Sequence, residues 1–396
     1  MTAPGANTPF VAIACGGTGG HLFPGLAVAE QLQKQGCAVA LLVSPKEVDR
    51  QAVKSARDLE VFTLPAVGLQ NRNYFSFAVS FVKSLFAARE VFRRRKPAAV
   101  LAMGGFTSAP PVWVGKDFGA KTFLHESNTI PGRANRYLAR FVNEAFVGFP
   151  EAASRLRTKK CTVTGTPVRP QFSQSAIRDP QSAISLGLDP DLPTILVVGG
   201  SQGASGLNEV ILSALPLLAE KNWQWLHLAG PKDVAKVEQA YAARGCKAAV
   251  KPFLAEMDVA LGAASVAVSR AGASSLAEFA ALRVPSLLVP FPAAADNHQF
   301  FNAQAFETTG AARLLEQREA TPEKVAARLT ELVEDSAARG RMQAALAQWH
   351  APGAAEQIAE IMLHAIARAR EGGPAADQTH DCHCGGSPRP AKTVAH

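Results

Sequence analysis

Near the start of the chain, the stretch best suited to chemistry is Cys15-Gly16-Gly17-Thr18-Gly19-Gly20-His21. Its four glycines allow positive φ angles and let a ligand approach bare backbone N–H groups. It follows an apolar run at residues 10–14, a predicted strand, and precedes residues 24–33, whose apolar spacing predicts a helix. The helix N-terminus would add free N–H donors and a dipole that favours an anion. The stretch therefore predicts either a phosphate site beside His21 or a plain tight turn capped by that histidine.

A second glycine turn, Gly199-Gly200-Ser201-Gln202-Gly203, follows the predicted strand at residues 194–198. It also fits G-x-S-x-G, the nucleophile elbow of serine hydrolases, with Ser201 as the nucleophile. A hydrolase would need an acid and then a histidine later in the chain, and Asp296 and His298 are too close together for a comfortable pair. It would also leave the first glycine turn unused. A serine hydrolase is therefore the alternative function.

A third glycine turn, Ser269-Arg270-Ala271-Gly272-Ala273, follows the predicted strand at residues 266–268 and leads to Ser274, Ser275 and Glu278. The hydroxyls suit a helix N-cap. If the turn faces a cleft, its hydroxyls and backbone N–H groups could bind phosphate, and Glu278 could accept hydrogen bonds from both hydroxyls of a ribose. A capping box, in which Glu278 only supports the start of the helix, explains the same pattern.

Other nucleotide and sugar chemistries are disfavoured. Neither of the first two turns reads G-x-G-x-x-G, and the second predicted strand ends at Val43-Ser44 without the acidic residue that binds a dinucleotide ribose. No Walker A sequence is present. Asp189-Pro190-Asp191 has the D-x-D spacing of metal-dependent sugar transferases, but its Pro-bearing position before a strand predicts a plain turn.

Length and composition indicate a soluble protein of two domains. The chain has 396 residues, which is long for one core, and 47% of them are hydrophobic. No run approaches the ~20 apolar residues of a membrane span, and we expect no signal peptide because a basic n-region is missing. The six cysteines are scattered as buried free thiols in a reducing compartment would be, which predicts a cytoplasmic protein.

The charge is unevenly spread. Residues 1–170 hold 22 Lys and Arg against 10 Asp and Glu, whereas residues 171–396 hold 19 against 23. Such asymmetry indicates that the first half faces something anionic. Nucleic acid is the less favoured candidate because no recognised binding module is apparent.

Residues 74–92 form an unusually aromatic stretch that ends in a basic run, Arg93-Arg94-Arg95-Lys96. A helix of this makeup could lie on an anionic bilayer. Alternatively, apolar side chains of the helix pack on the sheet, namely those of Val79, Val82, Leu85 and Phe86. We expect much of the helix to belong to the core, and a membrane role for its aromatic start and basic end stays open.

The pattern of strands and helices predicts the fold class, α/β. Predicted strands lie at residues 10–14, 38–43, 98–101, 122–125, 145–147 and 162–164, and then at 194–198, 225–228, 248–250, 266–268 and 286–289. Strands that alternate with helices make parallel sheets covered on both faces, with ligands beyond the carboxyl ends of the strands. We therefore expect two Rossmann-like parallel-sheet domains facing across a cleft.

The expected boundaries are a first domain at residues 1–170, a linker at 171–193 and a second domain at 194–350. A helix at residues 351–371 is expected to return to the first domain. The Gly-, Pro- and His-rich tail at residues 372–396 is expected to be disordered, and its Cys382-His383-Cys384 lacks a standard zinc spacing.

Seven motifs carry a resemblance, and they occur in one order. They are Gly16–His21 with Pro24-Gly25, Gly104-Gly105, His125-Glu126-Ser127-Asn128 with Pro131-Gly132 and Asn135-Arg136, Pro167-Val168-Arg169, Gly199–Gly203, Ser269–Ala273 with Glu278, and Asp296-Asn297-His298-Gln299 with Asn302-Ala303. Together they closely resemble the MurG family within glycosyltransferase family 28, over about residues 8–365.

The resemblance implies a GT-B glycosyltransferase whose second domain mainly binds UDP-GlcNAc and whose first domain binds the lipid acceptor. The implied reaction is inverting transfer of GlcNAc to the C4 hydroxyl of MurNAc in undecaprenyl-pyrophosphoryl-MurNAc-pentapeptide. That step converts lipid I to lipid II in peptidoglycan synthesis. The resemblance implies no cofactor and no obligatory metal. It also implies a peripheral position on the anionic cytoplasmic surface of the inner membrane, with other cell-wall synthesis proteins as further candidate partners.

Carried over position by position, the resemblance implies UDP-GlcNAc contacts at Thr18, Gly19, Gly20, Asn128, Arg169, Ser201, Leu254, Ala273, Ser274, Ser275, Leu276, Ala277, Glu278 and Gln299. Glu278 would hold the ribose, Leu254 would meet the uracil through its backbone, and Gln299 would meet the sugar hydroxyls. His21 matches the family's candidate base, and Glu126 is the other titratable residue on the acceptor side. Ser127 and Thr166 stand where members commonly have glutamine and asparagine.

The implied chemistry suits these residue types. A UDP leaving group develops negative charge, which backbone N–H groups, helix N-termini and Arg169 would stabilise in the absence of a metal. The attacking hydroxyl must lose a proton, and a histidine with a pKa near ~6.5 can take it at neutral pH.

Overall fold

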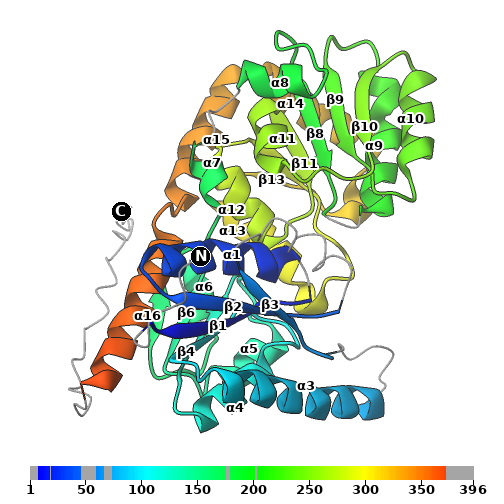
Figure 1. The fold of residues 1–396 in the computed structure, drawn as a ribbon. Coiled ribbons are helices and arrows are strands. Elements are labelled where there is room, and N and C mark those ends of the chain that lie inside the picture. Colours follow the sequence, from blue (N-terminus) through cyan, green and yellow to red (C-terminus); the bar gives the residue numbers. More distant parts are fainter. Residues whose placement is uncertain are drawn as a thin grey trace, which may run out of the picture.

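The computed structural model describes residues 8–17, 19–45, 59–66, 74–174, 179–200 and 203–371. Thr18, Ser201 and the predicted tail at residues 372–396 lie outside the described residues. The described chain forms two α/β halves, each built on its own parallel sheet (Figure 1). This confirms the predicted fold class.

The first sheet has seven strands in the order β3-β2-β1-β4-β5-β6-β7. Its strands are β1 (Phe10–Ala14), β2 (Ala38–Val43), β3 (Glu60–Thr63), β4 (Ala99–Ala102), β5 (Lys121–Glu126), β6 (Glu144–Val147) and β7 (Cys161–Val163). The helices between them are α1 (Gly19–Lys34), α3 (Tyr74–Arg94), α4 (Ala109–Asp117), α5 (Arg133–Leu138) and α6 (Pro150–Ala153). Alternate residues of β1 enter two separate apolar cores, one on each face of the sheet. Burial on both faces explains why these strands read as continuous apolar runs.

The second sheet has six strands in the order β10-β9-β8-β11-β12-β13. Its strands are β8 (Thr194–Val198), β9 (Gln224–Leu228), β10 (Lys247–Lys251), β11 (Val266–Ser269), β12 (Ser286–Leu288) and β13 (Arg313–Leu314). Its helices are α9 (Ser205–Leu218), α10 (Val234–Ala242), α11 (Met257–Ala263), α12 (Ala273–Ala281), α13 (His298–Thr308), α14 (Pro322–Glu334) and α15 (Ser336–Trp349). Each half therefore places the carboxyl ends of its strands along one edge.

All eleven predicted strands are present, with bounds within one residue of the prediction. Two strands were not predicted. β3 lies at the edge of its sheet and is only partly buried, so it lacks an apolar run. β13 is two residues long and partly buried at the opposite edge of the second sheet. Short edge strands carry little of the pattern by which buried strands are recognised.

Helix α1 begins five residues earlier than predicted, at Gly19 instead of residue 24. His21 therefore lies in the first turn of the helix and not in the loop before it. Pro24 was expected to start the helix but lies inside it. Because proline has no N–H, the carbonyl of Gly20 receives no hydrogen bond from residue 24. That carbonyl is free to accept a bond from elsewhere.

The predicted linker contains two short helices, α7 (Pro170–Gln174) and α8 (Pro180–Ser185). Asp179 caps α8 by accepting hydrogen bonds from the backbone N–H groups of Gln181 and Ser182. The Asp189-Pro190-Asp191 segment is a turn in which the Asp191 N–H donates to the Asp189 carboxylate. The plain turn predicted there is confirmed.

Helix α3 is more exposed than predicted. Phe75 and Phe86 are 81% and 70% exposed, and Val79 and Val82 also face solvent. The expectation that Val79, Val82 and Phe86 pack on the sheet is therefore wrong. The face turned inward is formed by smaller residues and by Phe92 near the end of the helix. Figure 1 shows α3 running along the base of the first half with its start projecting beyond the sheet.

The last helix, α16 (Ala354–Arg370), lies within residues 351–371, where the sequence predicts it. It follows the second half in sequence but packs against α1 in the first, as Figure 1 shows. Ile358 and Met362 are fully buried in the same apolar core as Val11 and Leu26. The first half is therefore completed by residues that come after the second.

We predict that Ile358→Ala destabilises the first half by about 2–5 kcal/mol, because a fully buried side chain is removed and leaves a cavity. Urea denaturation would measure this. Glu360→Ala, at an exposed position of the same helix, is the matched control and should change stability by less than about 0.5 kcal/mol. Equal effects of the two substitutions would contradict the packing of α16.

Candidate active site

The three glycine turns all follow carboxyl ends of strands, where parallel sheets bind ligands. The first follows β1, the second follows β8, and the third follows β11. The two halves meet there, because α1 of the first contacts α12 of the second (Figure 1). The Ser274 hydroxyl donates a 2.9 Å hydrogen bond to the carbonyl of Gly20. This is the carbonyl that Pro24 leaves without its helical partner.

The imidazole of His21 lies against bare backbone. A Cβ on Gly104 would be 3.0 Å from its Nε2, and a Cβ on Gly105 would be 3.1 Å from its Nδ1. Both glycines also have positive φ angles, 110° and 77°. A side chain at either position would strain the backbone and press on the ring. The pair Gly104-Gly105 therefore sets the place of His21 at the meeting of the two halves.

The carboxylate of Glu126 is buried and accepts four hydrogen bonds. Its Oε1 accepts from the backbone N–H and the side-chain amide of Asn128, at 2.9 and 3.0 Å. Its Oε2 accepts from the N–H of Gly132 and the amide of Asn135, both at 2.9 Å. A carboxylate with both oxygens so engaged would have to release a bond before it took a proton. Its arrangement suits ordering the 127–132 loop better than proton transfer.

His125, the residue before Glu126, is also fully buried. Its Nε2 lies 3.0 Å from the carbonyl of Gly165, which can only accept, so Nε2 carries the proton. Its Nδ1 is then free to accept from the hydroxyl of Ser127 at 3.2 Å. Burial lowers the pKa of His125, which keeps the ring neutral. Ser127 thus contacts a structural histidine.

Arg169 places a buried positive charge near enough to Glu278 of α12 to act on its carboxyl. Its guanidinium lies 4.3 Å from the ring centre of Phe23 and 5.1 Å from that of Phe172. Within the described part of the chain its Nε has no hydrogen-bond partner, although the residue is only 9% exposed. A buried guanidinium with a donor to spare is suited to binding a phosphate oxygen.

Glu278 lies on α12, and burial raises the pKa of its carboxyl to about 7. The charge of Arg169 lowers this pKa and that of Asp258 raises it, both by less than burial does. Gly272 precedes the helix as its N-cap without a side-chain cap, so the structure does not form the capping box considered for Glu278. A buried carboxyl whose pKa is raised in this way is typical of ligand-binding and catalytic sites.

Gln299 joins α13 to the third glycine turn. Its side-chain oxygen accepts from the N–H of Ala271 at 3.2 Å and from that of Phe291 at 3.0 Å. The turn before α13 is unusual because Asp296 and Asn297 both have left-handed backbone angles, with φ of 50° and 53°. These two strained residues lie directly before α13, whose Gln299 contacts the third glycine turn.

The structure brings together most of the predicted site residues that it describes. Gly20 is hydrogen-bonded to Ser274, the charge of Arg169 acts on Glu278, and Gln299 binds Ala271 directly before α12. Gly19 and His21 lie beside Gly20 at the start of α1, Asn128 lies in the first-domain loop held by Glu126, and Ala273, Ser275, Leu276 and Ala277 share α12 with Ser274 and Glu278. Leu254 packs on the core of the second half, in the loop before the helix that carries Asp258. Thr18 and Ser201 lie outside the described residues. The roles assigned to all of these residues stay predictions.

Asn302 on α13 was given no role from the sequence. It is fully buried and binds Asn128 and Thr129 of the first half and Ala271 of the second. One signal could have found it: it follows Gln299 by three residues, so the two share a helix face. A polar residue on that face needs a buried partner.

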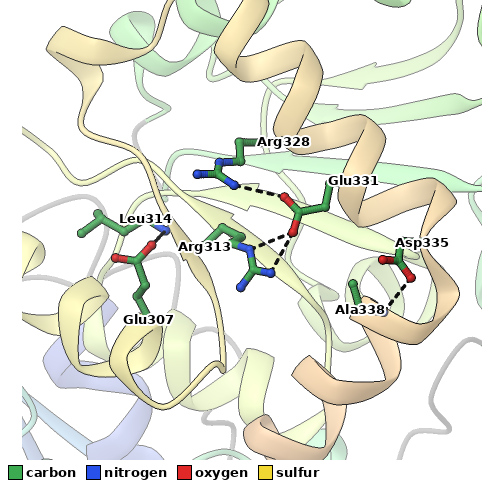
Figure 2. A network of polar contacts seen from close by, with 7 residues as sticks. All are labelled: Glu307, Arg313, Leu314, Arg328, Glu331, Asp335 and Ala338. Atoms are coloured by element: carbon green, nitrogen blue, oxygen red, sulfur yellow. Dashed lines mark hydrogen bonds and ion pairs between the residues drawn. The ribbon is translucent and has the colours of Figure 1, made fainter.

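A cavity of about 440 Å³ lies away from the glycine turns, between β13 and α14. Two of its acidic side chains have partners in Figure 2: Glu331 binds Arg313 and Arg328, and Glu307 accepts from the backbone N–H of Leu314. The described residues hold no group of three or more His, Cys, Asp or Glu able to bind a metal ion. None of the helices in the described ranges combines the length and apolar character that crossing a bilayer requires.

Comparisons with known proteins agree with this architecture. The profile described as glycosyltransferase family 28 N-terminal domain matches residues 11–147, and that described as glycosyltransferase family 28 C-terminal domain matches residues 194–358. A protein of Anaeromyxobacter sp. (strain Fw109-5) is 35% identical over 92% of this chain and 96% of its own length. Its name is UDP-N-acetylglucosamine--N-acetylmuramyl-(pentapeptide) pyrophosphoryl-undecaprenol N-acetylglucosamine transferase.

A protein of the same name from Xanthomonas axonopodis pv. citri (strain 306) is 37% identical over 91% of this chain and 83% of its own length. The chain belongs to the MurG family. The crystal structure of Acinetobacter baumannii MurG is similar, with a TM-score of 0.70 and 27% identity over 90% of this chain and 99% of that one. Two facing parallel-sheet domains in a MurG-family chain constitute the GT-B fold.

Membership of the MurG family does not support the serine hydrolase alternative. The proposed acid and histidine also have other partners in the structure. Asp296 forms an ion pair with Arg136 at 2.6 Å, and the Nδ1 of His298 lies 2.8 Å from the carbonyl of Ala295. The second glycine turn precedes α9 in the part of the chain that matches the glycosyltransferase family 28 C-terminal domain.

We predict that Glu278→Gln stabilises the ligand-free protein at pH 8 by on the order of 3 kcal/mol. The folded pKa is raised from 4.5 to about 7, so folding favours the protonated form. The contribution of the Glu278 carboxyl to stability is therefore fully present below pH 4.5 and is lost as the pH rises through about 7. Urea denaturation at pH 5 and pH 8 would show the advantage of the glutamine shrinking at the lower pH. Glu209→Gln, at an exposed position, should show no such pH dependence.

Proposed function

We propose that this chain transfers GlcNAc from UDP-GlcNAc to the C4 hydroxyl of MurNAc in lipid I, which gives lipid II for peptidoglycan synthesis. The names of its relatives support this, since they are 35–37% identical over most of the chain. The observation that carries it is the placement of His21, Arg169 and Glu278 at one junction between two domains. A titratable ring, a buried cation and a buried carboxyl there match the needs of sugar-nucleotide transfer.

The donor would bind mainly to the second domain. Glu278 would accept from the ribose hydroxyls, and Gln299 would meet the sugar after releasing the N–H groups it now binds. The start of α12 and the free donor of Arg169 would meet the diphosphate. No metal is required in this scheme, because these groups are fixed before the leaving group develops its charge.

His21 is the proposed general base of the inverting transfer. It would take the proton from the acceptor hydroxyl as that oxygen attacks the anomeric carbon and UDP leaves from the opposite face. Glu126 is the other candidate, and its four hydrogen bonds favour a structural role. The acceptor would approach from the first domain, past Gly104-Gly105.

We predict that His21→Ala lowers kcat by about 10²–10⁴-fold and leaves the Kd of UDP-GlcNAc within about 3-fold, because a base acts only on the acceptor. Transfer from radiolabelled UDP-GlcNAc to a lipid I analogue measures kcat, and calorimetry measures Kd. His364→Ala, on the exposed side of α16, is the control and should keep full activity. Full kcat in His21→Ala would refute the assignment.

The acceptor is a lipid, and we propose that α3 docks the enzyme on the anionic cytoplasmic surface of the inner membrane. Phe75 and Phe86 are the most exposed large apolar residues of that helix, and its last turn is basic. A chain of aromatic rings continues from α3 toward α5, with centroids 5.2–6.1 Å apart at Phe77, Phe81, Trp113, Tyr137 and Phe141. Apolar rings beside a basic run suit the boundary of an anionic bilayer.

We predict that Phe75→Ser with Phe86→Ser weakens binding to vesicles containing anionic phosphatidylglycerol by at least 10-fold, because both rings would enter the bilayer. Co-sedimentation measures the binding, which should also fall as salt rises. Leu217→Ser, at a similarly exposed position on α9, should have no effect. Salt-independent binding, or equal effects of the two changes, would overturn α3 as the docking face.

A further inference from the structure

The side-chain amide of Asn302 makes its full set of four hydrogen bonds, three of them across the junction of the two domains. Its Oδ1 accepts from the N–H and the hydroxyl of Thr129, both at 2.9 Å. Its Nδ2 donates to the Oδ1 of Asn128 at 3.0 Å and to the carbonyl of Ala271 at 3.1 Å. The Thr129 N–H can only donate and the Ala271 carbonyl can only accept, so the amide has one orientation.

The partners of Asn302 come from both domains. Asn128 and Thr129 lie in the first-domain loop that Glu126 orders. Ala271 lies in the third glycine turn, directly before the start of α12. One turn of α13 earlier, Gln299 binds the N–H of Ala271. Helix α13 therefore binds both the N–H and the carbonyl of Ala271. Through Asn302 it also binds the 127–132 loop of the first domain.

These bonds differ from the ion pairs that the turn before α13 makes with the first domain. Asp296 pairs with Arg136 at 2.6 Å and with Arg133 at 3.8 Å, but these side chains are partly or largely exposed, and such pairs contribute little in water. Asn302 is fully buried, and its three bonds to Asn128 and Thr129 form only where the two domains are closely apposed. Separation of the domains would break the bonds to Asn128 and Thr129 together and leave the bond to Ala271.

We propose that Asn302 is a positioning residue that couples the third glycine turn of the second domain to the 127–132 loop of the first domain where the two domains meet. The inference rests on the proposed transfer reaction. That reaction needs the acceptor oxygen about 3–3.5 Å from the anomeric carbon, and a misplacement of about 1 Å costs about 10²-fold in rate. Asn302 acts through Asn128, Thr129 and Ala271 and does not itself exchange a proton.

We predict that Asn302→Ala lowers kcat by about 10²-fold and changes the Kd of UDP-GlcNAc by less than about 3-fold. Transfer to a lipid I analogue and calorimetry with UDP-GlcNAc supply the two numbers. Arg136→Gln removes the exposed contact of the same interface and is the matched control, with kcat expected within 3-fold of the unsubstituted enzyme. A merely structural role would lower the melting temperature without separating kcat from Kd.

Two further variants test the coupling itself. Thr129→Val removes one hydroxyl donor to Asn302 and keeps the side-chain shape, so its effect on kcat should vanish when Asn302 is already alanine. Asn302→Asp places a carboxylate oxygen against the Ala271 carbonyl. Its activity relative to the unsubstituted enzyme should rise as the pH falls, because the protonated acid can donate to that carbonyl.

An inter-domain distance, measured with one fluorophore on each domain, separates this proposal from the reaction on which it rests. Asn302→Ala should shift the distance distribution toward wider separations, even if no transfer to lipid I is found. Additive effects of Thr129→Val and Asn302→Ala, or a loss confined to UDP-GlcNAc affinity, would overturn the coupling. If Asn302→Ala does not fold, Thr129→Val and Asn302→Asp supply the same comparison.

Discussion

Each domain contains polar groups whose hydrogen-bond partners lie in the other domain. Pro24 deprives the Gly20 carbonyl of its helical partner, and the Ser274 hydroxyl of the second domain supplies one. Asn302 of the second domain has a side-chain amide that forms hydrogen bonds with residues of both domains. Because buried polar groups are costly when unpaired, these contacts fix how the domains approach each other. The proposed reaction takes place at the junction so defined.

At that junction, the absence of a side chain at two glycines lets the ring of His21 pack on the backbone. Gly104 and Gly105 let the His21 ring lie directly on the backbone, where a Cβ at either position would press on it. The charges are arranged differently, since Arg169 and Glu278 are both buried and influence each other without a direct hydrogen bond in the described contacts. A ligand carrying both phosphates and hydroxyls would satisfy both groups at once.

The sequence was most informative where residues are buried on both sides. Strands such as β1, β2 and β8 are continuous apolar runs, so their bounds could be predicted to the residue. The edge strands β3 and β13 lack that signal. Helix α3 misled because the apolar side chains of Val79, Val82 and Phe86 suggested packing on the sheet, whereas the structure exposes all three. Asn302 was missed because its importance comes from Thr129 and Asn128, which are brought to it by the fold and are distant in sequence.

The return of α16 to the first domain has a mechanical consequence. The chain crosses between the domains once after β7 and a second time between α15 and α16. Near the second crossing, Trp349 stacks on Phe306 with ring centres 4.4 Å apart, and Phe149 of the first domain packs against both. Two tethers define a line about which rigid bodies can rotate but across which they cannot slide freely. We expect any separation of the domains to be a rotation about the line through these two crossings, and such a rotation would break the bonds of Asn302 to the first domain.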